Sequence, residues 1–234
     1  MKGRDKEMNR ISSAQRQSLV AGVDYGVGLD YHGTAPYIAE DEEAVTDAFL
    51  DLVYARKHHL PLVLFETERL IVREMTLEDL PQLYEIYAGE GITDYIEPLY
   101  AYAEEEAFTR AYIEHMYGFY GYGLWLVFLR DGTLIGRAGL ENREINGENQ
   151  VELGYVIGKE FQRQGYAYEC CRAILRYAFA EDELDLAQVI LCTSPDNTAS
   201  AALANKLGFR RLMEASEETH GLDIYSILNQ RHNG

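Results

Sequence analysis

The strongest structural signal in this chain is an apolar stretch that leads through a glycine-containing turn into a helix-like segment. The apolar stretch is residues 151–157, the turn contains Gly165, and the helical pattern runs from Ala167 to Phe179. The first amides of a helix have no acceptor inside the helix, and the helix dipole favours negative charge beside them. Glycine lets the backbone approach such a charge closely. This order predicts an anion-binding site at the turn.

A second unit of the same kind lies further along the chain. Residues Ala187 to Thr193 have the composition of a buried strand, and a helical pattern follows them. Asp196 or Asn197 is a suitable cap for the start of that helix, and Gly208 is a suitable end. This β-α-β-α-β order, placed after antiparallel strands, predicts a mixed sheet.

The segments before residue 151 predict antiparallel strands and further helices. They are a strand over 66–74, a helix after the capping-box-like start Thr76–Asp79, a helix over Glu104–Tyr117, strands Leu124–Leu129 and Leu134–Leu140 joined at Asp131-Gly132, and a polar loop over Asn142–Gln150. The predicted fold class is α/β (mixed α+β), with a central mixed, mostly antiparallel sheet and helices on both faces.

Both strand–helix units carry short motifs in a fixed order. Gln162, Gly165 and Ala167 match the pattern Q/R-x-x-G-x-G/A, and Asn197 and Ser200 match N-x-x-S before a downstream K-L-G-F. In this order the motifs resemble those of the GCN5-related N-acetyltransferases (GNAT). Within that family the pattern is closest to the branch that includes ribosomal-protein N-terminal acetyltransferases of the RimJ and RimL type. The resemblance also implies a GNAT-like fold.

The resemblance covers roughly residues 64–229 and sets the expected domain boundaries. Residues 63–234 are expected to form a GNAT acetyltransferase domain, and residues 1–62 an N-terminal extension of unassigned function. Within the extension we expect residues 1–20 to be flexible. Residues Asp41–Arg56 have the apolar spacing of one amphipathic helix.

The resemblance implies acetyl-CoA as co-substrate and assigns residues to it. In the family, the edge of the strand before the turn binds the pantetheine arm and thioester, the turn cradles the pyrophosphate, and the second motif lies close to the pantetheine. The residues concerned are Tyr155, Val156 and Ile157 for the edge, Gln162, Arg163, Gln164, Gly165, Tyr166, Ala167 and Tyr168 for the turn, and Asn197 and Ser200 for the second motif. Ordinary helix capping explains Asn197 and Ser200 equally well.

Acetyl transfer to an amine requires a base, because an amine with a pKa near ~10.4 is almost entirely protonated at neutral pH. Related enzymes often carry a carboxylate on the cofactor strand, and Glu152 is the candidate here. A solvated strand carboxylate is the other interpretation. Many family members have a tyrosine acid at the position that Ala204 occupies. We therefore predict no general acid.

The chain is strongly acidic, with a formal net charge of −18. This charge argues against a nucleic-acid partner and would attract a cationic acceptor, although it serves solubility equally well. No segment approaches the ~18 apolar residues of a membrane span, and the polar N-terminus does not have the pattern of a secretory signal. Cys170, Cys171 and Cys192 have no metal-site or disulfide spacing. We expect reduced thiols, no bound metal, no membrane partner and a cytoplasmic location.

Together these features predict an acetyl-CoA-dependent N-acetyltransferase that acts on a primary amine by direct attack in a ternary complex. A protein N-terminus, a polyamine, an amino acid and an aminated drug are the acceptor types in view. A non-catalytic acyl-CoA-binding or regulatory module is the alternative, since the expected tyrosine is missing. A dinucleotide-dependent oxidoreductase is disfavoured because no G-x-G-x-x-G follows an early strand. Base rates favour a homodimer.

Overall fold

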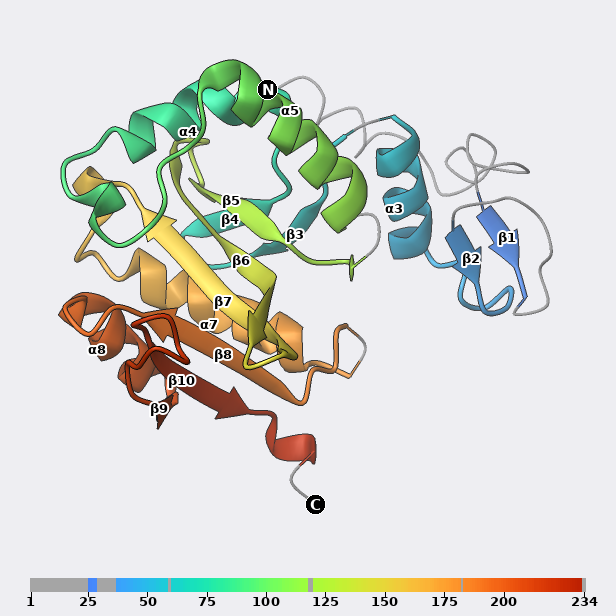
Figure 1. Cartoon of the computed structure of the whole chain (residues 1–234). Helices are drawn as coiled ribbons and strands as arrows, with labels where there is room; N and C mark the ends of the chain where they lie inside the picture. The colour runs from blue at the N-terminus through green and yellow to red at the C-terminus, as the bar shows by residue number, and fades with distance from the viewer. Residues whose placement is uncertain (1–24, 29–36, 59, 118–119, 182, 233–234) are drawn as a thin grey trace. The chain divides into compact units, whose positions relative to one another are not determined.

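The computed structural model describes five stretches of the chain, and the chain divides into two compact units, Met1–Leu62 and Val63–Gly234 (Figure 1). The described stretches are residues 25–28, 37–58, 60–117, 120–181 and 183–232. The flexibility predicted for residues 1–20 falls outside them.

The first unit contains a parallel pair of short strands and one helix. Its elements are β1 (Tyr25–Val27), β2 (Tyr37–Ala39) and α3 (Asp47–Lys57). Leu50 and Val53 of α3 are buried in a small cluster of their own. These residues form a separate apolar centre in this unit.

The helix of the first unit begins later than its apolar spacing predicts. The Asp41 carboxylate accepts hydrogen bonds from the amides of Glu43 and Ala44, both at 2.9 Å, and holds this segment in a turn. The Thr46 hydroxyl then accepts from the Phe49 amide at 3.2 Å and caps α3. The start predicted at Asp41 is wrong because side chains that bond nearby amides compete with helix formation.

The second unit is built on an eight-stranded sheet with the order β3-β4-β5-β6-β7-β8-β10-β9. Neighbouring strands are antiparallel except β7 and β8, which are parallel. The strands are β3 (Val63–Glu66), β4 (Leu70–Arg73), β5 (Leu124–Leu129), β6 (Leu134–Ile145), β7 (Glu148–Ile157), β8 (Gln188–Thr193), β9 (Arg210–Met213) and β10 (Asp223–Leu228). This confirms the predicted mixed, mostly antiparallel sheet.

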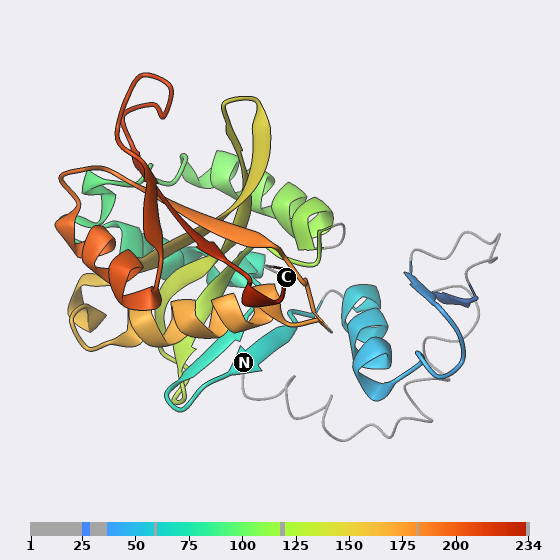
Figure 2. The ribbon, with the colours of Figure 1, turned by 90° about the horizontal axis from the view of Figure 1, so that it is seen from below.

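Helices lie on both faces of this sheet, as Figure 2 shows. The α-helices are α4 (Leu80–Tyr87), α5 (Tyr102–Tyr112), α7 (Tyr166–Phe179) and α8 (Thr198–Leu207), with a π-helical turn at Ile113–Tyr117 and short 3₁₀ turns at Leu77–Asp79, Ile92–Asp94, Lys159–Phe161 and Gln230–His232. The main core packs α7 against the central strands, with Trp125 and Ile174 fully buried. A smaller core packs α4 on the other face, around Leu83 and Leu126.

The segment predicted as a polar loop over Asn142–Gln150 is instead the end of a long hairpin. β6 and β7 stay in register from Gly136 and Ile157 out to Ile145 and Glu148. Asn146 and Gly147 form the tip with φ of 52° and 80°, the left-handed pair that a two-residue hairpin turn requires. The loop prediction is wrong because a strand pair that projects beyond the core carries polar side chains on both faces.

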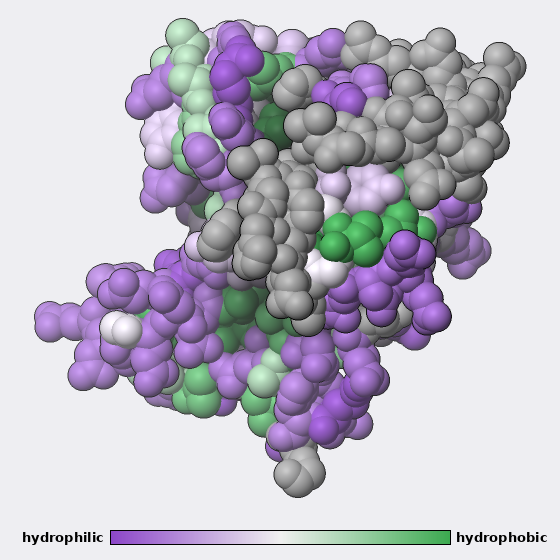
Figure 3. Space-filling view, turned by 90° about the vertical axis from the view of Figure 1, so that its right-hand side faces the viewer, coloured by the Kyte–Doolittle hydropathy of each residue, from purple (hydrophilic) through white to green (hydrophobic). Residues whose placement is uncertain are grey.

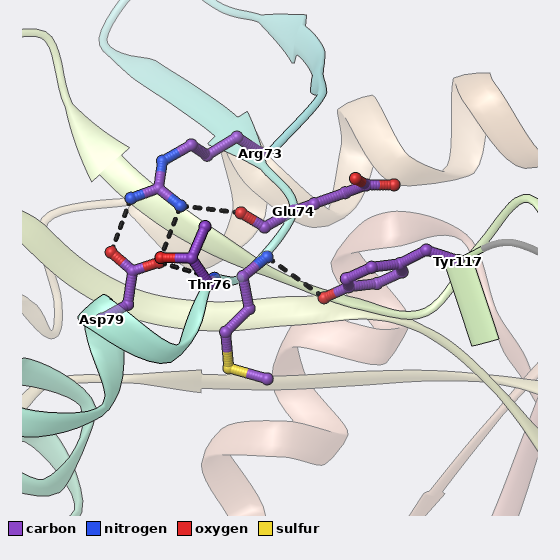
Figure 4. A network of polar contacts seen from close by, with 6 residues as sticks. Arg73, Glu74, Thr76, Asp79 and Tyr117 are labelled. Carbon is purple, nitrogen blue, oxygen red and sulfur yellow. Dashed lines mark hydrogen bonds and ion pairs between the residues drawn. The ribbon is translucent and has the colours of Figure 1, made fainter. Parts of the chain in front are cut away.

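A buried ion pair links β4 to the start of α4 (Figure 4). The Arg73 Nη2 and Asp79 Oδ1 atoms lie 2.6 Å apart, and both side chains are less than 10% exposed. The Asp79 carboxylate also accepts from the Thr76 amide at 2.8 Å and from its hydroxyl at 2.9 Å. The predicted capping residues therefore start a helix, and Asp79 among them also pairs with the buried charge of Arg73.

The three cysteines are free thiols, as the sequence predicts. Cys170 and Cys171 are buried in α7, and Cys192 is half-buried in β8. Hydrophilic residues cover much of the coloured surface on the side shown in Figure 3.

Candidate active site

The turn between β7 and α7 presents a row of unpaired backbone donors. Arg163 and Gly165 adopt left-handed conformations, with φ of 59° and 86°. Within the described chain, none of the backbone N–H groups from Arg163 to Tyr168 donates a hydrogen bond to protein. Left-handed residues beside a helix start gather such N–H groups into a concave site for an anion, which the helix dipole reinforces.

Two glutamine side chains fix the shape of this turn. Gln162 Nε2 donates to the carbonyl of Ile157 at 3.0 Å, which ties the turn to the last residue of β7. Gln164 Nε2 donates to the carbonyl of Glu160 at 2.8 Å. Because the Gln162 and Gln164 side chains donate to protein carbonyls, the backbone N–H groups of the turn are the donors available to an anion.

Arg69, which the sequence interpretation missed, fastens the turn to the first strands of the sheet. Its Nη1 donates to the Gln164 carbonyl at 3.0 Å, and its Nε lies 2.6 Å from Glu169 Oε2. Burial opposes ionisation of Glu169, but hydrogen bonds from Thr67 and Arg69 outweigh burial and lower the pKa of this carboxyl. The Arg69 guanidinium also lies over the Tyr166 ring, 4.4 Å from its centre.

β7 and β8 part beside the turn. Among the described residues, Glu152 and Ile190 form the one bridge between these strands. Beyond it, Tyr155, Val156 and Ile157 pair with β6 on one side and have no strand partner on the other. The structure therefore brings the predicted edge residues and the predicted turn residues to the same end of the sheet.

The second motif lies on α8 beside this opening. The Asn197 side chain accepts from the Ser200 amide at 3.0 Å and caps α8, and Gly208 ends the helix in a left-handed conformation. Burial raises the pKa of Tyr155 to about 12, against a hydrogen bond with the Ser200 side chain that lowers it. Asn197 therefore caps α8, and the Ser200 side chain also contacts Tyr155 of β7. Ala204 is fully buried.

Glu152 sits where β7 and β8 begin to separate. Its Oε2 lies 2.8 Å from Arg143 Nη1, and its Oε1 accepts from the Cys192 amide at 3.3 Å. The side chain is 16% exposed. The carboxylate therefore bridges the two strands through a side chain at the point where their backbone pairing stops.

A second carboxylate, also missed by the sequence interpretation, faces the same side of the sheet. Glu141 is the register partner of Glu152, and its Oε1 lies 3.2 Å from the Tyr112 hydroxyl. Burial raises the pKa of Glu141, although Arg137 and the Tyr112 hydrogen bond oppose the rise. Alternation along β6, which puts Arg137 and Glu141 on one face, is the signal that could have found both.

The family model described as acetyltransferase (GNAT) domain matches residues 69–210. The chain belongs to the GNAT acetyltransferase family. It is therefore an acetyltransferase, and the family supports transfer of an acetyl group to an amine. GNAT enzymes use acetyl-CoA as their acetyl donor.

Among the curated relatives of this GNAT chain is the uncharacterized N-acetyltransferase YnaD of Bacillus subtilis, which is 30% identical over 145 residues that make up 62% of this chain and 81% of YnaD. The putative ribosomal N-acetyltransferase YdaF of the same organism is 32% identical over 118 residues, 48% of this chain and 63% of YdaF. The name of YdaF agrees with the predicted branch of the family.

The fold of this GNAT chain resembles a spermidine N-acetyltransferase from Vibrio cholerae, solved in complex with CoA and spermine. The TM-score is 0.57 at 22% identity, over 72% of this chain and all of that one (100%). In the described parts of this GNAT chain, no cluster of three or more His, Cys, Asp or Glu side chains is suited to a metal ion. The same residues contain no helix of the length and apolarity that a membrane crossing needs.

Proposed function

We propose that this chain transfers an acetyl group from acetyl-CoA directly to a primary amine in a ternary complex. The row of unpaired N–H groups from Arg163 to Tyr168 carries this proposal. A pyrophosphate offers several acceptor oxygens and negative charge to such a row. Gln162 and Gln164 keep the row in shape through their bonds to Ile157 and Glu160.

The opening between β7 and β8 is the proposed place for the pantetheine arm. Backbone groups of Tyr155, Val156 and Ile157 on the open side of β7 would bond the arm as a strand neighbour would. Ser200 and Asn197 border the same opening from α8. A backbone N–H on this edge would also stabilise the negative charge that develops on the thioester oxygen.

Glu152 is the proposed base for the attacking amine, directly or through a water molecule. Arg143 and the Cys192 amide hold its carboxylate at the mouth of the opening, where the thioester would end. A base held at this point is already oriented toward the amine, which lowers the entropic cost of reaching the reactive geometry. From the sequence we expect the protein to form a homodimer and to be cytoplasmic.

Replacing Gly165 by valine should weaken acetyl-CoA binding by about tenfold or more, because a β-branched residue resists the left-handed conformation that shapes the turn. Calorimetric titration with acetyl-CoA and with CoA measures this. Gly147→Val is the matched control, since Gly147 is also left-handed but lies at the hairpin tip in open space. Equal affinity of both variants would contradict the pyrophosphate assignment.

Replacing Glu152 by glutamine should lower acetyl transfer by about a hundredfold while acetyl-CoA still binds, because the amide cannot accept the amine proton. Release of free thiol in the presence of a panel of amines gives the rate. Glu148→Gln, on an exposed position of the same strand, should leave the rate unchanged. Full turnover by the Glu152 variant would remove this residue as the base.

A further inference from the structure

A buried guanidinium lies on the sheet face that carries Glu141 and Glu152. Arg137 of β6 is 7% exposed, and its Nε has no hydrogen-bond partner among the described residues. It takes part in no ion pair within 4.0 Å in that part of the chain. This sets it apart from Arg73 on the same face, which pairs with Asp79.

The protein surroundings of Arg137 satisfy only part of its hydrogen-bonding capacity. The Tyr87 phenol bonds it, and the Tyr112 ring centre lies 5.9 Å from its central carbon. A guanidinium has five N–H donors in a planar fork that matches a carboxylate. Because a buried charge without an ionic partner is costly, an anion from outside the fold that paired with this guanidinium would offset the cost.

The positions around Arg137 suggest which anion this is. On one face, β6 presents Arg137, then Gly139, then Glu141, and the register partners on β7 are Val156, Gly154 and Glu152. Gly139 and Gly154 carry no side chains between the guanidinium and the two carboxylates, and the backbone of Gly123 covers Gly139. A Cβ atom added at Gly154 would meet only Leu124 Cδ2, at 3.4 Å, within 4 Å.

We infer that the acceptor is a free amino acid, whose carboxylate binds Arg137 and whose amine lies at Glu141 and Glu152. This inference rests on the proposed function, because it assigns the amine to the carboxylate that would deprotonate it. Arg137 and Glu141 are four residues apart, or about 13 Å along an extended strand, and both lie on the face where Gly154 carries no side chain. The inference favours a substrate with both charges over a polyamine or an amidated peptide.

The acceptor profile of the unaltered protein tests this inference without any change in the fold. Each amino acid is assayed with acetyl-CoA beside its carboxamide and its decarboxylated amine. We expect kcat/KM to fall by about tenfold to a hundredfold when the carboxylate is removed, as for loss of a charged hydrogen bond. Equal or higher kcat/KM for the carboxamides and decarboxylated amines would overturn the inference.

Arg137→Met, which keeps the apolar stem, separates substrate binding from a structural role. We expect this variant to raise KM for the amino acid, to leave kcat/KM for the decarboxylated amine unchanged, and to keep the melting temperature unchanged or higher. Lower stability with equal loss for every amine would show a structural role and overturn the inference. Acetylation of amines without a preference for carboxylates would leave the transferase intact, whereas absence of acetyl-CoA binding would remove the proposed function itself.

Discussion

Replacing Gly139 by alanine should destabilise the second unit by about 3 kcal/mol or more, because the new methyl group would meet backbone rather than a movable side chain. The Cβ atom would lie 1.9 Å from the Gly123 carbonyl oxygen and 2.8 Å from its carbon. The same oxygen accepts from the Leu140 amide at 3.1 Å. Relief of the clash therefore requires β5 and β6 to separate. Urea unfolding followed by circular dichroism measures the loss.

Gly154→Ala is the matched control for this change, since Gly154 is the register partner of Gly139 on β7. Its added Cβ atom would make one contact, at 3.4 Å from Leu124 Cδ2, which is ordinary packing distance. The expected change is within about 1 kcal/mol of zero, because alanine also restricts the unfolded chain. Similar losses for both variants would show that the clash at Gly123 is relieved by a small shift.

Replacing Asp79 by alanine should destabilise the second unit by about 3–5 kcal/mol, because the buried Arg73 guanidinium would lose the carboxylate that binds both of its terminal nitrogens. Asp79 Oδ1 and Oδ2 lie 2.6 and 2.8 Å from the two Arg73 terminal nitrogens (Figure 4). The change also removes the acceptor for the Thr76 amide. The loss should appear in both thermal and urea unfolding.

Two further variants show whether charge burial is the cause. Glu106→Ala breaks an exposed ion pair with Arg110, at 2.9 Å, and should cost at most about 0.5 kcal/mol. The double variant Arg73→Met, Asp79→Leu replaces the buried pair by apolar groups and should recover most of the stability lost in Asp79→Ala. A double variant as unstable as Asp79→Ala would assign the loss to packing and helix capping instead.

Local signals in the sequence were sufficient for the cofactor half of the fold. The cap at Asn197, the stop at Gly208 and the turn at Gly165 act on their immediate neighbours, so their types and positions determine the backbone there. The sequence predicted the backbone less well where polar composition and turn-forming residues indicated different structures. At Asn146-Gly147 the polar composition hid a hairpin, although the dipeptide itself favours one.

Contacts between residues far apart in the chain are not revealed by one sequence. Arg69 and Glu169 are 100 positions apart in the chain, and nothing near either one indicates the other. The buried face of α5 carries Glu105 and Thr109, while Phe108 is 43% exposed. The Glu105 carboxylate accepts from the Tyr100 amide at 3.0 Å, a contact that apolar periodicity along the helix does not reveal.

The single bridge between β7 and β8 has a consequence for amide hydrogen exchange. Alternate N–H groups along a strand point to opposite neighbours, so those of Tyr155–Ile157 that point away from β6 have no strand to protect them. They should exchange much faster than their neighbours in the same strand. A molecule bound in the opening would slow them selectively, so the exchange pattern of one strand would report occupancy before any substrate is known.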